Sequence, residues 1–173
     1  SLQEQGATSL LFDVRFNPGG HKDELVELLD YLLPEGPLFR SVDYKGNEDI
    51  DYSDASCVEL PMAVLVNEDS YSAAEFLAAA LQEYEWATIV GSQTYGKGNF
   101  QTAFYLSDGS MVNLSIGKYY TPGGKSLSET GVTPDVVVDL DDEQYALLYY
   151  NALEQADDPQ FQAAIDTLTQ KIS

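Results

Sequence analysis

Stretches of apolar residues in the first half of the chain follow two different spacings. Continuous apolar runs are typical of strands in a buried sheet, and they occupy residues 9–16, 62–66 and 87–90. Apolar residues three or four positions apart are typical of helices that bury one face, and they occupy residues 23–33 and 72–84. Strands that alternate with helices in this way predict an α/β domain.

The second half of the chain has a different pattern. Strands are predicted at residues 38–44, 100–106, 111–120 and 136–140, and helices at residues 142–153 and 158–172. The pair Asp108-Gly109 separates two of these strands and is a hairpin-turn signal. Residues 46–56 are acidic and predict either a loop or the return strand of a hairpin. The whole pattern therefore predicts one α/β domain with a mixed β-sheet core flanked by helices.

Composition and charge narrow the possible functions. The 173 residues carry 8 Lys and Arg against 29 Asp and Glu, a formal net charge of −21. Such a charge repels the phosphates of nucleic acids and anionic membrane surfaces, so neither is an expected partner. The aromatic content of 12% favours a packed core over disorder. One cysteine and one histidine exclude a disulfide framework and multi-Cys or His-rich metal sites.

Neither a membrane span nor a leader is visible. No apolar run approaches the length of a transmembrane helix. The first residues lack the basic and apolar regions of a secretory signal, and the chain does not begin with Met. We therefore expect the chain to be a single domain taken from a longer protein.

Two strand ends lead into residues that could take part in a chemical reaction. The strand at 9–16 leads into the turn Asn17-Pro18-Gly19-Gly20, and the strand at 62–66 leads to Ser72 at the start of a helix. Sites in α/β sheets lie beyond the carboxyl ends of the strands. Ser72 and Glu75 fit a structural capping box. Capping is the simpler interpretation of the pattern, although the unpaired N–H groups of the first helical turn would also suit a serine nucleophile, because they can hold an oxyanion.

A serine nucleophile needs a base, and two residues are candidates. His21 follows the glycine turn, although a solvent-exposed loop histidine is the simpler interpretation. Lys97 lies in the loop Thr94-Tyr95-Gly96-Lys97-Gly98 after the strand at 87–90. A helix over residues 73–85 rises about 1.5 Å per residue and a strand over residues 86–91 returns about 3.3 Å per residue, so each spans about 20 Å. This return would bring Lys97 back to the level of Ser72.

Four blocks of sequence in the same order resemble the carboxyl-terminal processing proteases, a family of Ser/Lys peptidases. The blocks are residues 12–20 (FDVRFNPGG), 64–75 (VLVNEDSYSAAE), 91–101 (GSQTYGKGNFQ) and 119–125 (YYTPGGK) with 131–135 (GVTPD). The resemblance implies a crotonase/ClpP-like α/β core and a serine endopeptidase that cleaves polypeptides near their C-terminal regions. It implies no metal or cofactor and an extracytoplasmic location: membrane-associated, periplasmic or secreted. Self-association into a homo-oligomer is compatible with it.

The resemblance also implies roles for individual residues. Ser72 matches the nucleophile, Lys97 the general base and Gln101 the residue that orients the lysine amine. The N–H groups of Ala73 and of Gly19 or Gly20 match the oxyanion hole, and the choice between the two glycines stays open. Carried over, these roles form an acyl-enzyme mechanism.

The sequence departs from the family pattern in two ways. Tyr71 replaces a small residue before the nucleophile, and Phe16 replaces a polar residue. The family's PDZ domain and N-terminal segments, which would lie upstream of the first block, are absent from this sequence. We therefore expect a catalytic core whose activity on its own is open.

Two physical effects act in opposite directions on Lys97 as the proposed base. The mechanism needs the Lys97 amine uncharged, whereas acidic surroundings favour the ammonium, so burial against Tyr95 and Phe100 would have to favour the amine. An ion pair with Asp69 or Glu75 would instead make Lys97 a structural cation.

Several alternatives remain open at this stage. A catalytically silent module that binds peptides or apolar ligands on the same fold is the main one. An acyl-CoA enzyme of the crotonase type is disfavoured, because the acidic field would repel the phosphates of its substrate. Residues 47–54 form a calcium loop or, by default, a solvated acidic turn. Cys57 is expected to be a half-buried hydrophobe, and Tyr145, Tyr149 and Tyr150 are expected to pack rather than bind a ligand.

Overall fold

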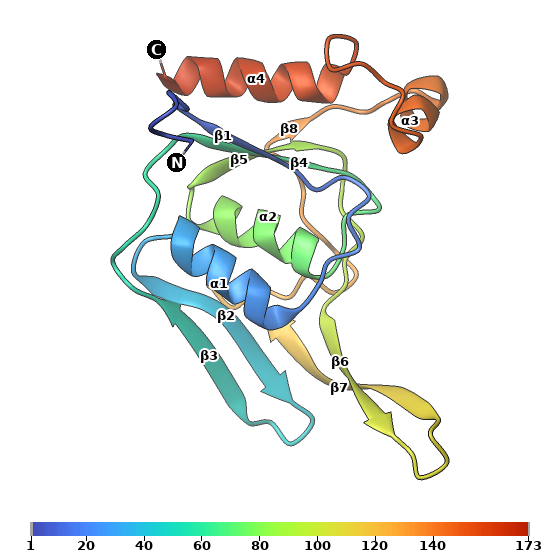
Figure 1. Ribbon diagram of the computed structural model, residues 1–173. Helices are drawn as coiled ribbons and strands as arrows, with labels where there is room; N and C mark the ends of the chain where they lie inside the picture. Colours follow the sequence, from blue (N-terminus) through green and yellow to red (C-terminus); the bar gives the residue numbers. More distant parts are fainter. Residues whose placement is uncertain (1, 173) are drawn as a thin grey trace.

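The computed structural model describes residues 2–172 and consists of two β-sheets with helices between and above them (Figure 1). The first sheet is parallel, with the order β1 (Leu10–Asp13), β4 (Met62–Val66), β5 (Ala87–Gly91) and β8 (Val136–Val137). The second is antiparallel, with the order β3 (Glu48–Ser53), β2 (Gly36–Asp43), β7 (Met111–Tyr120) and β6 (Asn99–Tyr105). The helices are α1 (Lys22–Leu32), α2 (Ala73–Glu83), α3 (Asp142–Tyr149) and α4 (Pro159–Ile172).

Burial explains the order of the layers. Every residue of β4 is 0% exposed, as its continuous apolar run predicts, because helices cover both faces of the first sheet. On one face, Val64 and Phe76 belong to the main core, which α1 and α2 form with the second sheet. On the other face, Ala63 and Leu65 pack in a smaller core with α4. Helix α2 is thus enclosed between the two sheets (Figure 1).

The predicted α/β class is confirmed, and the element boundaries agree closely with the sequence patterns. The parallel and antiparallel strands lie in two separate sheets. Residues 46–56 contain β3, so the acidic segment is the return strand of a hairpin. Strand β1 ends at Asp13, earlier than residue 16, because the Asp13 carboxylate accepts the Arg15 backbone N–H at 3.1 Å and turns the chain. Helix α3 ends at Tyr149 rather than at residue 153, and β8 ends at Val137 rather than at residue 140.

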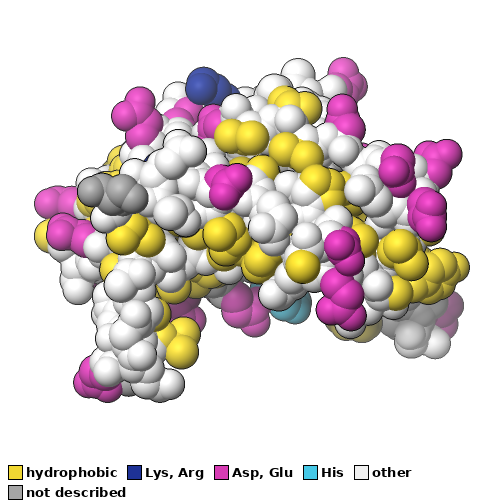
Figure 2. All heavy atoms as spheres, turned by 90° about the horizontal axis from the view of Figure 1, so that it is seen from above, with side chains coloured by type: hydrophobic (Ala, Val, Ile, Leu, Met, Phe, Trp, Pro, Cys, Tyr) yellow, Lys and Arg dark blue, Asp and Glu magenta, His cyan; other side chains and the backbone are white. Residues whose placement is uncertain are grey.

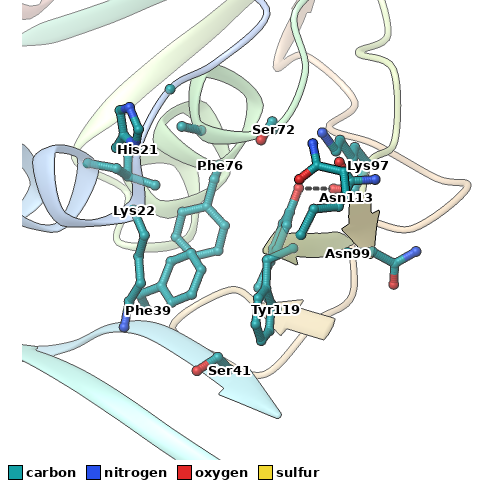
Figure 3. A pocket seen from close by; sticks show the side chains of 15 residues that line it. His21, Lys22, Phe39, Ser41, Ser72, Phe76, Lys97, Asn99, Asn113 and Tyr119 are labelled. Atoms are coloured by element: carbon teal, nitrogen blue, oxygen red, sulfur yellow. Dashed lines mark hydrogen bonds between the residues drawn. The ribbon is translucent and has the colours of Figure 1, made fainter. Parts of the chain in front are cut away.

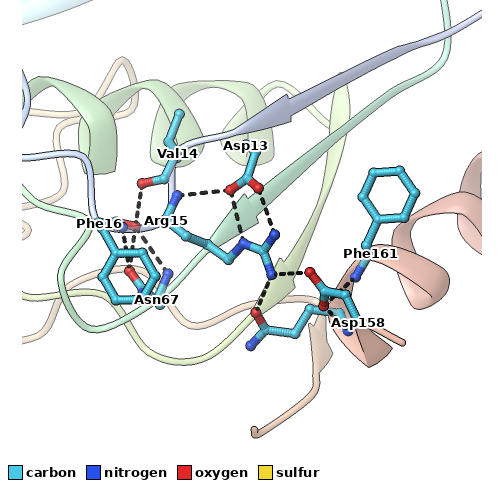
Figure 4. A network of polar contacts seen from close by, with 9 residues as sticks. Asp13, Val14, Arg15, Phe16, Asn67, Asp158 and Phe161 are labelled. Carbon is cyan, nitrogen blue, oxygen red and sulfur yellow. Dashed lines mark hydrogen bonds and ion pairs between the residues drawn. The ribbon is translucent and has the colours of Figure 1, made fainter. Parts of the chain in front are cut away.

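A buried arginine fixes the end of β1 (Figure 4). The Arg15 side chain is only 4% exposed and forms ion pairs with Asp13 at 2.6 Å and Asp158 at 2.7 Å. It also donates to Gln160 Oε1 at 3.0 Å. Because Asp158 and Gln160 lie at the start of α4, this network joins the carboxyl end of β1 to α4, and the turn that follows β1 begins from a fixed point.

The surface reflects the acidic composition. Figure 2, which looks onto the molecule from the α4 side of Figure 1, shows Asp and Glu side chains scattered among apolar ones, with Lys and Arg nearly absent. This face therefore lacks the basic footprint that phosphate backbones require. Within residues 2–172, no helix is long and apolar enough to cross a bilayer.

Candidate active site

A cavity of about 470 Å³ lies between α1, α2 and the second sheet (Figure 3). One part of its wall is apolar, from Leu25, Phe39, Phe76 and Phe100. Another part is polar and carries most of the residues that the sequence analysis singled out. These are Gly20, His21, Ser72, Ala73, Lys97 and Gln101. The fold thus brings together, in one cavity, residues from five separate segments of the chain: 20–25, 39–41, 72–76, 97–101 and 113–119.

Ser72 is the N-cap residue of α2 and has a strained backbone conformation, with φ 60° and ψ −125°. Its hydroxyl makes no capping hydrogen bond, so the serine half of the predicted capping box is not formed. The neighbouring Ser70 is different. Its hydroxyl is buried, donates to the Val14 carbonyl at 2.7 Å and accepts the Asn67 N–H at 3.0 Å. Ser70 is therefore a structural serine, and Ser72 is the serine that faces the cavity.

The turn after β1 packs directly on Ser72. A Cβ on Gly19 would lie 2.7 Å from Ala73 N and 2.8 Å from Ser72 Cβ, and its φ is +90°. The Gly19 N–H donates to Asn17 Oδ1 at 2.9 Å, so it is already engaged. A Cβ on Gly20 would meet nothing within 4 Å, and Gly20 lines the cavity. The two glycines thus have different tasks: Gly19 permits close approach to Ser72, and Gly20 borders the open space.

This difference yields a matched pair of predictions. We expect Gly19→Ala to lower the free energy of unfolding by more than about 1 kcal/mol, because it combines a steric clash with a left-handed φ. Gly20→Ala should leave stability nearly unchanged, because its Cβ points into open space. Urea denaturation of both variants measures the two effects. Equal losses, or a larger loss for Gly20→Ala, would contradict the packing described here.

The loop that carries Lys97 is held by a buried glutamate on α2. Glu75 is 0% exposed, and its Oε1 accepts Thr94 Oγ1 at 2.5 Å and the Gly96 N–H at 2.6 Å. Its Oε2 accepts the Lys97 N–H at 2.9 Å. Burial raises the pKa of Glu75, and hydrogen bonds from Thr94, Gly96, Lys97 and Ser72 partly offset this. Glu75 therefore anchors the base loop to the helix that begins at Ser72.

The Lys97 side chain lies at the same end of the cavity as Ser72 (Figure 3). It is half-buried, and its Nζ lies 5.7 Å from the centroid of the Tyr71 ring. Within residues 2–172 it forms no ion pair: Glu75 binds the backbone instead, and Asp69 accepts the Tyr145 hydroxyl at 2.7 Å. Lys97 is thus not a structural cation paired with either carboxylate.

The aromatic surroundings of Lys97 differ from the expectation in one respect. Tyr95 is 66% exposed and packs against Tyr71, with ring centroids 5.4 Å apart, so it does not wall the amine from water. Tyr71, which replaces a small residue of the family pattern, faces the amine itself. Phe100 is half-buried and lines the cavity as expected.

Gln101 and His21 both line the cavity and are both exposed. In the described part of the chain, no hydrogen bond joins Gln101 to Lys97. In the view of Figure 3, Ser72 lies between His21 and Lys97, so both candidate bases border the same space.

Sequence reasoning missed the contribution of Tyr119. Its hydroxyl donates to the Lys97 carbonyl, and its side chain is buried in the cavity wall. Tyr119 is part of the sequence block at residues 119–125, but nothing in that block indicated a role for it. No local pattern reveals a contact between a strand and a distant loop. Glu75 was singled out only as a cap or a counter-ion, and neither role describes its hold on the loop.

The structure also bears on the predictions made for the acidic segment, the cysteine and the C-terminal tyrosines. Strand β3 covers Glu48–Ser53, so most of the acidic segment 47–54 is a strand rather than the turn expected by default. Within residues 2–172, no cluster of His, Cys, Asp or Glu suited to a metal ion occurs. Cys57 is a partly buried free cysteine, as expected. Tyr145 and Tyr149 pack edge-on against Phe16 at 5.3 and 5.5 Å, which confirms their packing role. Tyr150 is 77% exposed and contacts Tyr149.

Comparison with known proteins identifies the class that this fold and cavity define. The model of peptidase family S41 matches residues 1–138, and the chain belongs to this family. It is 37% identical over 169 residues to the carboxyl-terminal-processing protease of Synechocystis sp., covering 97% of this chain and 38% of that protein. It is 36% identical over 152 residues to the carboxy-terminal processing protease CtpA of Bacillus subtilis, covering 87% of this chain and 32% of that protein.

Solved structures agree with this assignment. The photosystem II D1 C-terminal processing protease matches with a TM-score of 0.72 and 38% identity, covering 80% of this chain and 36% of that one. A tricorn protease shares the fold with a TM-score of 0.60 at 20% identity. The chain thus spans well under half the length of the relatives that it matches in sequence.

Proposed function

We propose that this chain is the catalytic core of a serine endopeptidase that cleaves polypeptides near their C-terminal regions. The proposal rests on one observation: Ser72 and Lys97 line the same cavity, and Lys97 forms no ion pair within residues 2–172. Relatives that match most of this chain are named carboxyl-terminal processing proteases. Because the chain covers only part of their length, the proposed activity refers to the full-length protein, in which further segments such as a PDZ domain would accompany this core.

The proposed mechanism is an acyl transfer through Ser72. The uncharged Lys97 amine takes the proton of the Ser72 hydroxyl as Oγ attacks the peptide carbonyl carbon. The resulting ammonium gives the proton to the leaving amine, and the acyl group stays on Ser72 as an ester. Water, deprotonated by the same amine, then hydrolyses this ester and restores the free serine.

The oxyanion would be held by backbone N–H groups. Ala73 is the first residue of α2, so its N–H belongs to the unpaired first turn. Gly20 is the proposed second donor, since the Gly19 N–H is bound to Asn17. Gln101 is proposed to orient the amine once substrate is bound, because it lies in the same cavity. None of these steps requires a metal or cofactor.

The surroundings support a polypeptide substrate. The apolar wall from Leu25, Phe39, Phe76 and Phe100 suits an apolar side chain next to the cleaved bond. The net charge of −21 supports neither nucleic acid nor acyl-CoA as a ligand. From the resemblance to carboxyl-terminal processing proteases, we also propose a location outside the cytoplasm. The alternative of a silent peptide-binding module of the same fold makes no use of Lys97 chemistry, which gives the test below.

The test compares the two candidate bases in the full-length protein. Degradation of an unfolded polypeptide is measured for the wild type, Lys97→Ala and His21→Ala, with folding checked by circular dichroism. We expect Lys97→Ala to lose at least about 1,000-fold in kcat, and His21→Ala to stay within about three-fold of the wild type. Loss in His21→Ala alone would reassign the base. A wild type that binds but never cleaves would establish the silent module.

A further inference from the structure

Tyr119 forms a hydrogen bond with the backbone of Lys97, the residue proposed as the base. Its hydroxyl donates a hydrogen bond to the Lys97 carbonyl oxygen (Figure 3). Its own backbone N–H donates to the carbonyl of the next loop residue, Gly98, at 3.1 Å. The last part of β7 is therefore bonded to the Lys97 loop through both a side chain and the main chain.

The position of the Tyr119 hydroxyl is fixed by packing. The side chain is 4% exposed, and its ring lies 5.7 Å from both Phe39 and Phe76, measured between centroids. A tyrosine ring enclosed in this way has little rotational freedom, so its hydroxyl is a rigid donor. Burial and the Glu75 charge raise the pKa of Tyr119, which keeps the hydroxyl protonated over the working pH range.

Glu75 and Tyr119 together form hydrogen bonds with both backbone polar groups of Lys97. Glu75 Oε2 accepts the N–H of Lys97 at 2.9 Å, and the Tyr119 hydroxyl holds its carbonyl. The two hydrogen bonds come from different elements, α2 and β7.

We propose that Tyr119 is a positioning residue that holds the Lys97 loop in register with Ser72, through its hydroxyl group. This inference rests on the proposed function, since it concerns the geometry of the proposed Ser72–Lys97 pair. Tyr119 touches the cavity wall but acts through Lys97. Loss of its hydroxyl should lower the rate of the chemical step and leave the binding of substrate nearly unchanged.

The experiment uses Tyr119→Phe in the full-length protein, which removes the hydroxyl and keeps the ring. Tyr84→Phe is the matched control, because the Tyr84 hydroxyl likewise donates to a backbone carbonyl, that of Pro37 at 2.9 Å, and does not line the cavity. We expect Tyr119→Phe to lower kcat about 10- to 100-fold with KM within about two-fold. Hydrogen exchange at the Gly96 and Lys97 amides should speed up about ten-fold. Tyr84→Phe should change neither quantity, whatever stability it loses.

A second pair of variants separates positioning from general destabilisation. In a Lys97→Ala background, Tyr119→Phe should cause no further loss of rate, because the group that it positions is already gone. Unchanged exchange at residues 96–97, or a kcat equal to that of the wild type, would overturn the proposal. So would an equal loss of kcat in Tyr84→Phe. If the wild type cleaves nothing, the proposed function fails, and the exchange measurement alone still decides whether Tyr119 holds the loop.

Discussion

Ser72→Ala is expected to abolish peptide cleavage, with a loss of at least about 10⁴-fold in kcat. The physical reason is that Ser72, at the start of α2, lies at the same end of the cavity as Lys97, whereas the other serine in the lining, Ser41, belongs to β2 (Figure 3). The free energy of unfolding should stay within about 0.5 kcal/mol of the wild type, because the Ser72 hydroxyl does not cap the helix. Activity and urea unfolding of the same preparation measure both effects.

Ser70→Ala is the matched control for this prediction. Ser70 lies two residues away and is 0% exposed, with hydrogen bonds to the Val14 carbonyl and the Asn67 N–H. We expect Ser70→Ala to lose about 1–3 kcal/mol of stability and to keep the kcat of the folded protein. The reverse outcome, with Ser70→Ala inactive and Ser72→Ala active, would exchange the roles of the two serines.

Glu75→Ala is expected to combine a large loss of stability with a loss of activity. It removes the acceptor for Thr94 Oγ1, which is buried, and for the N–H groups of Gly96 and Lys97, which are partly buried. Unpaired buried donors cost about 1–3 kcal/mol each, so we expect a loss of at least about 3 kcal/mol. The released loop no longer places Lys97, and we expect a fall of at least about 100-fold in kcat of the folded fraction.

The control for Glu75 lies on the same helix. Glu83 accepts the Gly123 N–H at 2.8 Å and pairs with Lys125 at 3.6 Å, outside the cavity. Glu83→Ala should therefore lose some stability without losing kcat. An equal loss of kcat in the two variants would show that Glu75 has no special relation to the Lys97 loop.

Glu75 also makes a defined contribution to the dependence of stability on pH. Burial raises its pKa in the folded protein above the ordinary value of 4.5, despite the opposing hydrogen bonds. Between pH 4.5 and the higher folded pKa, the folded state binds more protons than the unfolded state, so this contribution to stability falls as the pH rises. Glu75→Gln cannot titrate and should lack this slope. Urea unfolding of both proteins across that interval gives the comparison.

Much of the fold and the outline of the site follow from local patterns. The continuous apolar run at residues 62–66 and the helical spacing after Ser72 predicted β4 and α2. The similar lengths of α2 and β5 predicted that Lys97 returns to the level of Ser72, and the cavity contains both. These features depend on spacing along the chain, which a sequence carries directly.

Other features depend on contacts between distant segments. The choice between Gly19 and Gly20 turns on the Asn17 side chain, which folds back onto the Gly19 N–H. The hold of Tyr119 on the Lys97 carbonyl joins β7 to a loop 22 residues away. The separation of parallel and antiparallel strands into two sheets likewise depends on α2 filling the space between them. None of these leaves a periodic trace in the sequence.

The acyl-enzyme is the species that most directly tests whether Ser72 and Lys97 act as a catalytic pair. Full-length protein is mixed with a cleavable peptide ester, quenched in acid within the first turnover, and mapped by mass spectrometry. The account predicts an acyl group on the peptide that contains Ser72, absent in Ser72→Ala and formed at least about 1,000-fold more slowly in Lys97→Ala. Acylation of another residue, or an unchanged rate in Lys97→Ala, would contradict it.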